Sequence, residues 1–206
     1  MAILALDTCL SALTLALETS EGRAVSFSEE IGVGHAEKVA PACAKLFEEA
    51  GIEAADLTRI GVTVGPGSFM GQRVGIAFAK GLAMGSGAAT VPMTTLEAIA
   101  EGAGEAAQAL IDARRGQVYA QRFTADGEPE TEPSLISYEE GLTLLDDGRL
   151  ALGSGVQAVD PGRAAPTIIA ARPEALLAIT KTRAAAPLKT LYLRAPDAKP
   201  PSKAPL

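Results

Sequence analysis

The stretch Val64–Gly75, "VGPGSFMGQRVG", places four glycines and one proline between an apolar run and a segment of helical periodicity. A strand, a glycine-rich turn and a helix together form the arrangement in which free N–H groups at a helix start hold a phosphate. Gly65, Gly67 and Gly71 have the spacing G-x-G-x-x-x-G, one residue longer than the dinucleotide-binding pattern, and no Gly-Lys-Ser/Thr is present. The stretch therefore predicts a strand–turn–helix unit, and leaves open whether the turn holds a phosphate or only lets two backbones approach closely.

The helix that follows is expected to begin at a Ser68 cap. At 100° per residue, small side chains form one ridge on it, flanked by larger apolar ones. The ridge consists of Gly71, Gly75, Ala79 and Ala83, and the flanking residues are Val74, Phe78 and Leu82. An apolar arc of more than half the circumference is typical of a helix that packs on two sides.

An earlier amphipathic helix is predicted in "HAEKVAPACAKLFEEAG", from His35 to the stop at Gly51, with a bend or a start near Pro41. It carries a second small ridge of Ala36, Ala40 and Ala44, flanked by Val39, Cys43 and Phe47. Two such helices can approach closely and form a seam. Whether they are core helices or face a partner stays open at this point.

The remaining pattern predicts an α/β protein with two lobes. Three short strands, "AILALD", "ALTLALE" and "AVSFSEEI", come before the first helix, and "LTRIGVTVG" and "AATVPM" are further strands. From Glu105 the pattern restarts with a strand pair, "AQALIDAR" and "QVYAQRFTADG", followed by a strand running into a helix and a last helix in "ARPEALLAITKTRA". We expect an N-terminal lobe at 1–102, a smaller C-terminal lobe at 103–195 and a Pro/Lys-rich tail at 196–206.

Composition limits the function. The net charge is −7, aromatic residues make up 4% and Trp is absent, so the chain is not expected to grip nucleic acid by itself. Residues 1–159 hold 10 Lys/Arg against 22 Asp/Glu, whereas 160–206 hold 8 against 3, which leaves a solvated extension or a weak RNA contact open. No signal peptide or long apolar run is present, so we expect a cytoplasmic protein without a membrane partner.

Few residues suit independent catalysis. His35 is the only histidine and Val39 lies four positions on, so the helical histidine pair of a metal site is missing, and neither a metal ligand nor a catalytic residue is expected. Asp7, with Thr8, and Asp112 end apolar runs in corresponding places of the two lobes, where they could face nucleotide phosphates or serve as structural carboxylates. Arg114 and Arg115, beside Tyr119, could contact tRNA or a partner, or form a solvated hairpin edge.

Taken together, several motifs resemble the TsaB family, in its order and spacing, over roughly residues 1–198. They are "ILALDTCLSALTLAL", the helix opened by His35, "GPGSFMGQRVGIAFAKGLA", "DARRGQVYA" and "YLRAPDA". The chain differs from the commonest form of the family motif at Met70, Gln72 and Cys9. The resemblance implies an actin, sugar kinase and Hsp70-like (ribonuclease H-like) fold, with mixed sheets flanked by helices in both lobes.

The resemblance also implies a function: a non-catalytic scaffold that pairs with a TsaD-like transferase, joined by a TsaE-like ATPase, to modify the adenosine next to the anticodon of tRNA. ATP and a metal are then expected on the partner subunits, tRNA is reached through the complex, and a self-dimer is expected when the partner is absent. The alternative is a nucleotide-binding phosphotransferase or ATPase of the same superfamily.

Two sets of residues are assigned on this basis. The expected partner interface comprises His35, Val39, Cys43, Phe47, Gly71, Gly75, Phe78, Ala79 and Leu82. A vestigial nucleotide site is expected at Asp7, Thr8, Gly65, Gly67, Ser68 and Asp112.

Overall fold

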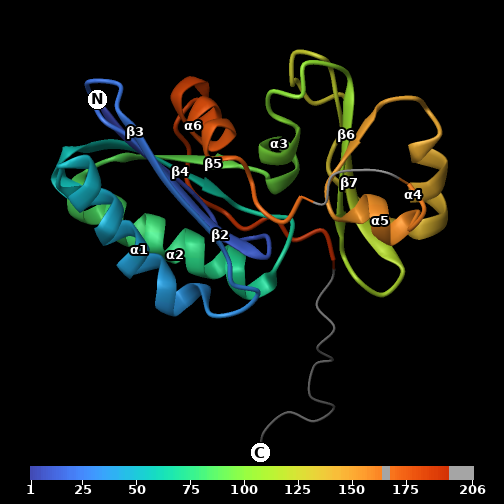
Figure 1. The fold of residues 1–206 in the computed structure, drawn as a ribbon, viewed down its shortest axis with the longest axis horizontal. Helices are drawn as coiled ribbons and strands as arrows, with labels where there is room; N and C mark the ends of the chain where they lie inside the picture. The colour runs from blue at the N-terminus through green and yellow to red at the C-terminus, as the bar shows by residue number, and fades with distance from the viewer. Residues whose placement is uncertain (164–167, 195–206) are drawn as a thin grey trace, which may run out of the picture.

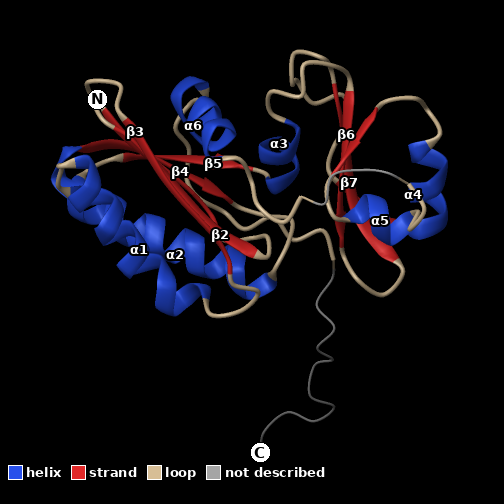
Figure 2. Cartoon of the chain, viewed as in Figure 1, coloured by secondary structure: helices blue, strands red, loops and turns tan. Residues whose placement is uncertain are grey.

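Two mixed β-sheets stand side by side in the computed structural model, which describes residues 1–163 and 168–194 (Figures 1 and 2). The first sheet has five strands in the order β3-β2-β1-β4-β5. Their bounds are β1 Ala2–Asp7, β2 Ala12–Glu18, β3 Ala24–Glu30, β4 Leu57–Thr63 and β5 Ala89–Met93. β1 pairs antiparallel with β2 and parallel with β4, so it is the central strand, and all six of its residues are buried. Burial on both faces explains why its sequence is an apolar run without alternation.

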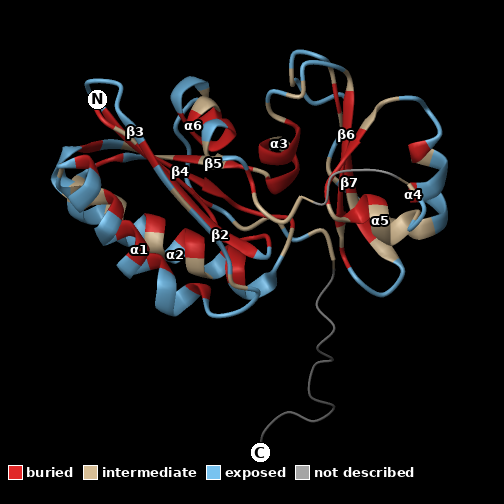
Figure 3. Ribbon diagram, viewed as in Figure 1, coloured by how far each residue is buried: buried red, intermediate tan, exposed pale blue. Residues whose placement is uncertain are grey.

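Two helices cover one face of this sheet. α1 (His35–Ala50) and α2 (Phe69–Ser86) lie side by side there, and Figure 3 shows buried residues on their sheet side and exposed residues on their outer side. α1 runs through Pro41 without a break. Ser68 caps α2 by accepting a hydrogen bond from the backbone N–H of Gly71 at 3.1 Å, which confirms the predicted cap.

The other face is covered by α6 (Pro173–Thr182), which packs on β1, β2 and β4. The range 103–195 expected for the second lobe therefore contains a helix that returns to the first sheet. Gly61 permits this close approach, because a Cβ there would lie 1.8 Å from Thr180 Oγ1. The Arg59 guanidinium further holds α6 through a hydrogen bond from Nε to the carbonyl of Thr180 at 2.8 Å.

The second sheet repeats this arrangement in a shorter form, in the order β8-β7-β6-β9. Its strands are β6 Ala107–Asp112, β7 Gln117–Phe123, β8 Ser134–Ser137 and β9 Leu150–Leu152. As in the first sheet, the leading strand pairs antiparallel with the next strand and parallel with a later one. α4 (Tyr138–Leu145) and α5 (Gly155–Val159) pack on one face, and α3 (Thr95–Ala100), opened by a Thr94 cap, packs on the other. The predicted two-lobed α/β fold with mixed sheets is confirmed.

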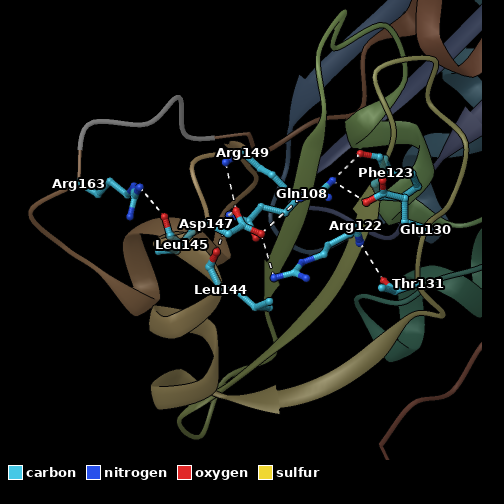
Figure 4. A network of polar contacts seen from close by, with 10 residues as sticks. All are labelled: Gln108, Arg122, Phe123, Glu130, Thr131, Leu144, Leu145, Asp147, Arg149 and Arg163. Atoms are coloured by element: carbon cyan, nitrogen blue, oxygen red, sulfur yellow. Dashed lines mark hydrogen bonds and ion pairs between the residues drawn. The ribbon is translucent and has the colours of Figure 1, made fainter.

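A polar network joins the strands of the second sheet to α4. The carboxylate of Asp147 binds the guanidinium groups of Arg122 at 2.9 Å and Arg149 at 3.3 Å, and Arg149 also reaches Glu130 at 2.6 Å (Figure 4). The Gln108 amide donates to the carbonyl of Leu144 at 3.0 Å. The half-buried charges are thus paired, and we assign the network to holding this lobe together.

After α6 the chain crosses from the first sheet to the second. The N–H of Ala186 donates to Thr90 at 2.9 Å, and that of Leu191 donates to Val64 at 2.8 Å. The Arg194 guanidinium then donates to Gln117 Oε1 at 2.8 Å. The predicted tail at 196–206, with two of the eight Lys/Arg residues of 160–206, lies outside the described residues.

Candidate functional site

The glycine stretch packs against the turn between β1 and β2. A Cβ on Gly71 would lie 1.9 Å from the carbonyl oxygen of Thr8, and one on Gly75 would lie 2.4 Å from Thr8 Oγ1. Thr8 Oγ1 donates to the carbonyl of Gly71 at 2.7 Å, and the N–H of Ser68 donates to that of Cys9 at 2.9 Å. Close approach of two backbones is therefore what these glycines permit.

The interior of the glycine turn is filled by a side chain. Gln72 is buried, and its amide lies against Gly65, where a Cβ would be 2.7 Å from Gln72 Cδ. The same amide donates to the carbonyl of Gly67 at 3.3 Å, while Ser68 Oγ is engaged in the cap. This packing does not fit a phosphate held in the turn.

Asp7 is fully buried at the carboxyl end of β1. Its Oδ1 accepts hydrogen bonds from Thr63 Oγ1 at 2.5 Å and from the N–H of Cys9 at 3.0 Å, while Oδ2 has no partner within the described residues. Burial raises the pKa of Asp7 above its ordinary value, although these hydrogen bonds act to lower it. Solvent does not reach this carboxyl.

Asp112 occupies the matching place at the end of β6. Its Oδ1 accepts from the N–H of Arg114 at 2.8 Å and from Tyr138 Oη at 2.9 Å. Burial and the hydrogen bond to this carboxylate raise the pKa of Tyr138. Asp112 thus shapes the turn between β6 and β7.

The residues expected at a partner interface divide into two groups. Six are buried within this chain, namely His35, Val39, Cys43, Gly71, Gly75 and Ala79. Phe47, Phe78 and Leu82 are half-buried and pack on the same core. The small ridge on α2 faces β1 and β4. Its residues therefore pack between the helix pair and the first sheet.

The exposed sides of the same two helices carry small and apolar side chains among charged ones. On α1 they are Ala36, Ala40 and Ala44, and on α2 they are Met70, Ala77, Gly81 and Met84. Met70 is 63% exposed and Met84 88% exposed, and nothing lies within 4 Å of a Cβ built on Gly81. We call these seven residues the outer face. On α2 they belong to its wide apolar arc, on the side away from the sheet, and they are not among the residues expected at the partner interface.

An aromatic cluster lies at the start of α2. The rings of Phe69 and Tyr192 are 5.5 Å apart, the Arg73 guanidinium sits 3.7 Å above the Phe69 ring, and Arg73 Nε donates to Tyr192 Oη at 3.1 Å. Phe69 and Tyr192 are both exposed. Such contacts hold the long side chains of the cluster in fixed positions beside Met70. The sequence pattern did not indicate the contribution of Tyr192, which comes from the far end of the chain.

Two findings concern metal binding and membrane insertion within residues 1–163 and 168–194. No group of three or more His, Cys, Asp and Glu side chains is placed there to hold a metal ion. In the same part of the chain, no helix is long and apolar enough to cross a membrane.

Comparison with known proteins gives consistent matches. The family model described as "TsaD: tRNA N6-adenosine threonylcarbamoyltransferase" matches residues 29–155. The Escherichia coli tRNA threonylcarbamoyladenosine biosynthesis protein TsaB is 32% identical over 173 residues, covering 77% of this chain and 73% of that protein.

Two solved structures from Pseudomonas aeruginosa share the fold. One, an uncharacterized protein with similarity to peptidase YeaZ, has a TM-score of 0.82 and 26% identity and covers 94% of this chain and 99% of its own. The other, YeaZ, has a TM-score of 0.77 and 27% identity and covers 87% and 90%.

Proposed function

The chain belongs to the TsaB/YeaZ family of TsaD-related proteins, and from this premise we propose that it takes part in the synthesis of threonylcarbamoyladenosine in tRNA. Its role is that of a non-catalytic subunit that binds and stabilises a TsaD-like transferase, with a TsaE-like ATPase joining the complex. The modified nucleoside is the adenosine next to the anticodon, and the modification takes place in the cytoplasm.

The outer face is the observation that carries this proposal. α1 and α2 cover the same face of the first sheet, so their exposed sides lie on one side of the molecule (Figure 3). Exposed methionines next to alanine and glycine form an apolar surface that water solvates poorly. Small residues let a partner helix approach closely, and the Phe69, Arg73 and Tyr192 cluster supplies side chains of the types that interfaces favour.

Three observations support a subunit that is not an enzyme by itself. Asp7 is buried away from solvent, the glycine turn is filled by Gln72, and His35 lies within the helix pair with Val39 four residues on. ATP and the metal are therefore assigned to the partner subunits. Among residues 1–163 and 168–194, these three features disfavour the alternative, a phosphotransferase acting alone.

A direct test is size-exclusion chromatography of this chain mixed with the TsaD-like subunit of its own cell, with ATPase activity measured on each peak. The expected result is a stable mixed peak and no ATPase activity from the chain alone. The outer face would also allow a self-dimer in the absence of the partner, which should disappear as the mixed peak forms. Separate elution of the two chains, or ATP hydrolysis by this chain alone, would refute the proposal.

A further inference from the structure

The turn between β6 and β7 holds two arginines in left-handed backbone conformation. Arg114 has φ 63° and Arg115 has φ 57°, and Gly116 follows with φ 73°. Within the described residues, these two are the only non-glycine residues with positive φ. A side chain in this conformation crowds its own backbone, and tight hairpin turns favour Asn, Asp or Gly there. The stability of the turn therefore does not explain why two arginines occupy it.

A third arginine reaches the same turn from the end of the described chain. The Arg194 guanidinium donates to the carbonyl of Arg114 at 3.2 Å and to Gln117 Oε1 at 2.8 Å. The Arg114 side chain is 86% exposed, and Arg115 is exposed as well. Three arginines from two distant segments thus meet at this turn of the second lobe.

Some of the acidic side chains near the turn already have hydrogen-bond or ion-pair partners. Asp112 accepts from the N–H of Arg114 and lies 3.3 Å from its guanidinium, so it orients that side chain. The N–H of Tyr138 donates to Gly116, which brings the start of α4 to the turn with Glu139 and Glu140. Glu140 accepts from the backbone N–H of Ser137 at 2.8 Å, and Glu139 is exposed.

We propose that Arg114, Arg115 and Arg194, the arginine turn, bind phosphate groups of an RNA backbone. The inference rests on the proposed function, which supplies tRNA as the nucleic acid. A guanidinium matches a phosphate with two parallel hydrogen bonds, which a lysine does not provide. Contacts of this kind position an RNA without reading its sequence, in keeping with the few aromatic residues of the chain. The chain has a net charge of −7, which opposes strong RNA binding by this chain alone. The arginine turn therefore contributes to the RNA binding of the assembled complex.

The test replaces both turn arginines with asparagine, which accepts the left-handed conformation and removes the charge. The probe is an unmodified tRNA transcript that reads a codon starting with A, titrated with salt against the complex and against the chain alone at low salt. The double variant R114N/R115N should weaken binding, and the slope of log K against log salt should become shallower by roughly 1 to 2. The melting temperature should rise by about 2 °C, since the strained arginines are gone.

Arg23→Asn is the matched control, because it removes one exposed arginine from the β2–β3 turn of the first lobe and should leave RNA binding unchanged. Unaltered RNA binding by the double variant would overturn the inference, and so would a fall in its melting temperature. Loss of transferase binding with RNA binding retained would assign the turn to a protein contact instead. If the unsubstituted chain fails to bind the transferase, the proposed function fails, whereas the titration on the chain alone still decides the RNA contact.

Discussion

The Cα of Gly71 faces the carbonyl oxygen of Thr8 so closely that a Cβ at position 71 would lie 1.9 Å from that oxygen. The start of α2 thereby packs directly on the turn after β1, with no side chain at position 71 to separate the two backbones. The glycine stretch thus allows close packing of α2 on the first sheet. The opposite sides of α1 and α2 are exposed.

Gly71→Ala should destabilise the fold strongly. The added methyl group meets a backbone carbonyl that cannot move without shifting the turn after β1, so we expect a loss of about 3 kcal/mol in the free energy of unfolding. Urea denaturation followed by circular dichroism measures it. Gly81→Ala on the exposed side of the same helix is the control, and should gain about 1 kcal/mol because alanine favours helix more than glycine does. Equal effects at both positions would contradict the packing role of Gly71.

Gly81→Leu should separate binding from folding. The new side chain points into open space, so the helix keeps its stability, but it fills the room that a partner helix needs. We expect the affinity for the TsaD-like subunit to fall about tenfold or more, measured by titration calorimetry. Thr182→Leu on α6, which covers the opposite face of the first sheet, should bind normally. Normal binding by Gly81→Leu would remove the outer face as the docking surface.

Asp7→Asn should change the pH dependence of stability and leave complex formation intact. Burial raises the pKa of Asp7 in the folded state, so the folded protein holds this proton more tightly than the unfolded chain does. The stability of the unsubstituted protein should accordingly fall as the pH rises from about 3.8, the ordinary pKa of an aspartate, through the raised pKa. Asparagine cannot titrate, so chemical denaturation at a series of pH values should show this decline disappear. A large loss of tRNA modification by the reconstituted complex would instead revive a nucleotide site at Asp7.

Glu97→Gln should weaken the attachment of the end of α6 to α3. The Glu97 carboxylate contacts the Arg183 guanidinium at 2.7 and 2.9 Å and accepts from the N–H of Thr94 at 2.6 Å. Burial acts to raise the pKa of Glu97, but these hydrogen bonds outweigh it and lower the pKa overall. A lowered acid pKa stabilises the fold above the unfolded value near 4.5, and this stabilisation is lost as the pH falls through the folded value.

The substitution should therefore cost about 1 to 2 kcal/mol at pH 7, and the difference from the unsubstituted protein should shrink below pH 4.5. Thermal melts at pH 7 and at pH 3.5 compare the two proteins. A difference that stays constant with pH would show that the charge of Glu97 contributes nothing.

Local pattern predicted the fold well. The apolar runs of β1 and β4, the cap at Ser68 and the stop at Gly51 each depend on residues near in sequence, and each lies where the pattern indicates. The interface assignment depended on which side of each helix meets the sheet. Helical periodicity shows which residues of α2 share a side, but it does not show which side faces the sheet, since both sides carry apolar or small residues.

The sequence by itself determined the order of the strands and helices from β1 to β5, the restart of the pattern in the second lobe, and the lack of a second histidine. Only the tertiary structure decided what the glycines do, because their neighbour Thr8 is 63 residues away from Gly71 along the chain. It also brought Tyr192 to Phe69 and Arg194 to Arg114, and returned α6 to the first sheet. These contacts arise from how separately predicted elements pack together, and the packing of elements distant in sequence leaves no periodic signal within any one of them.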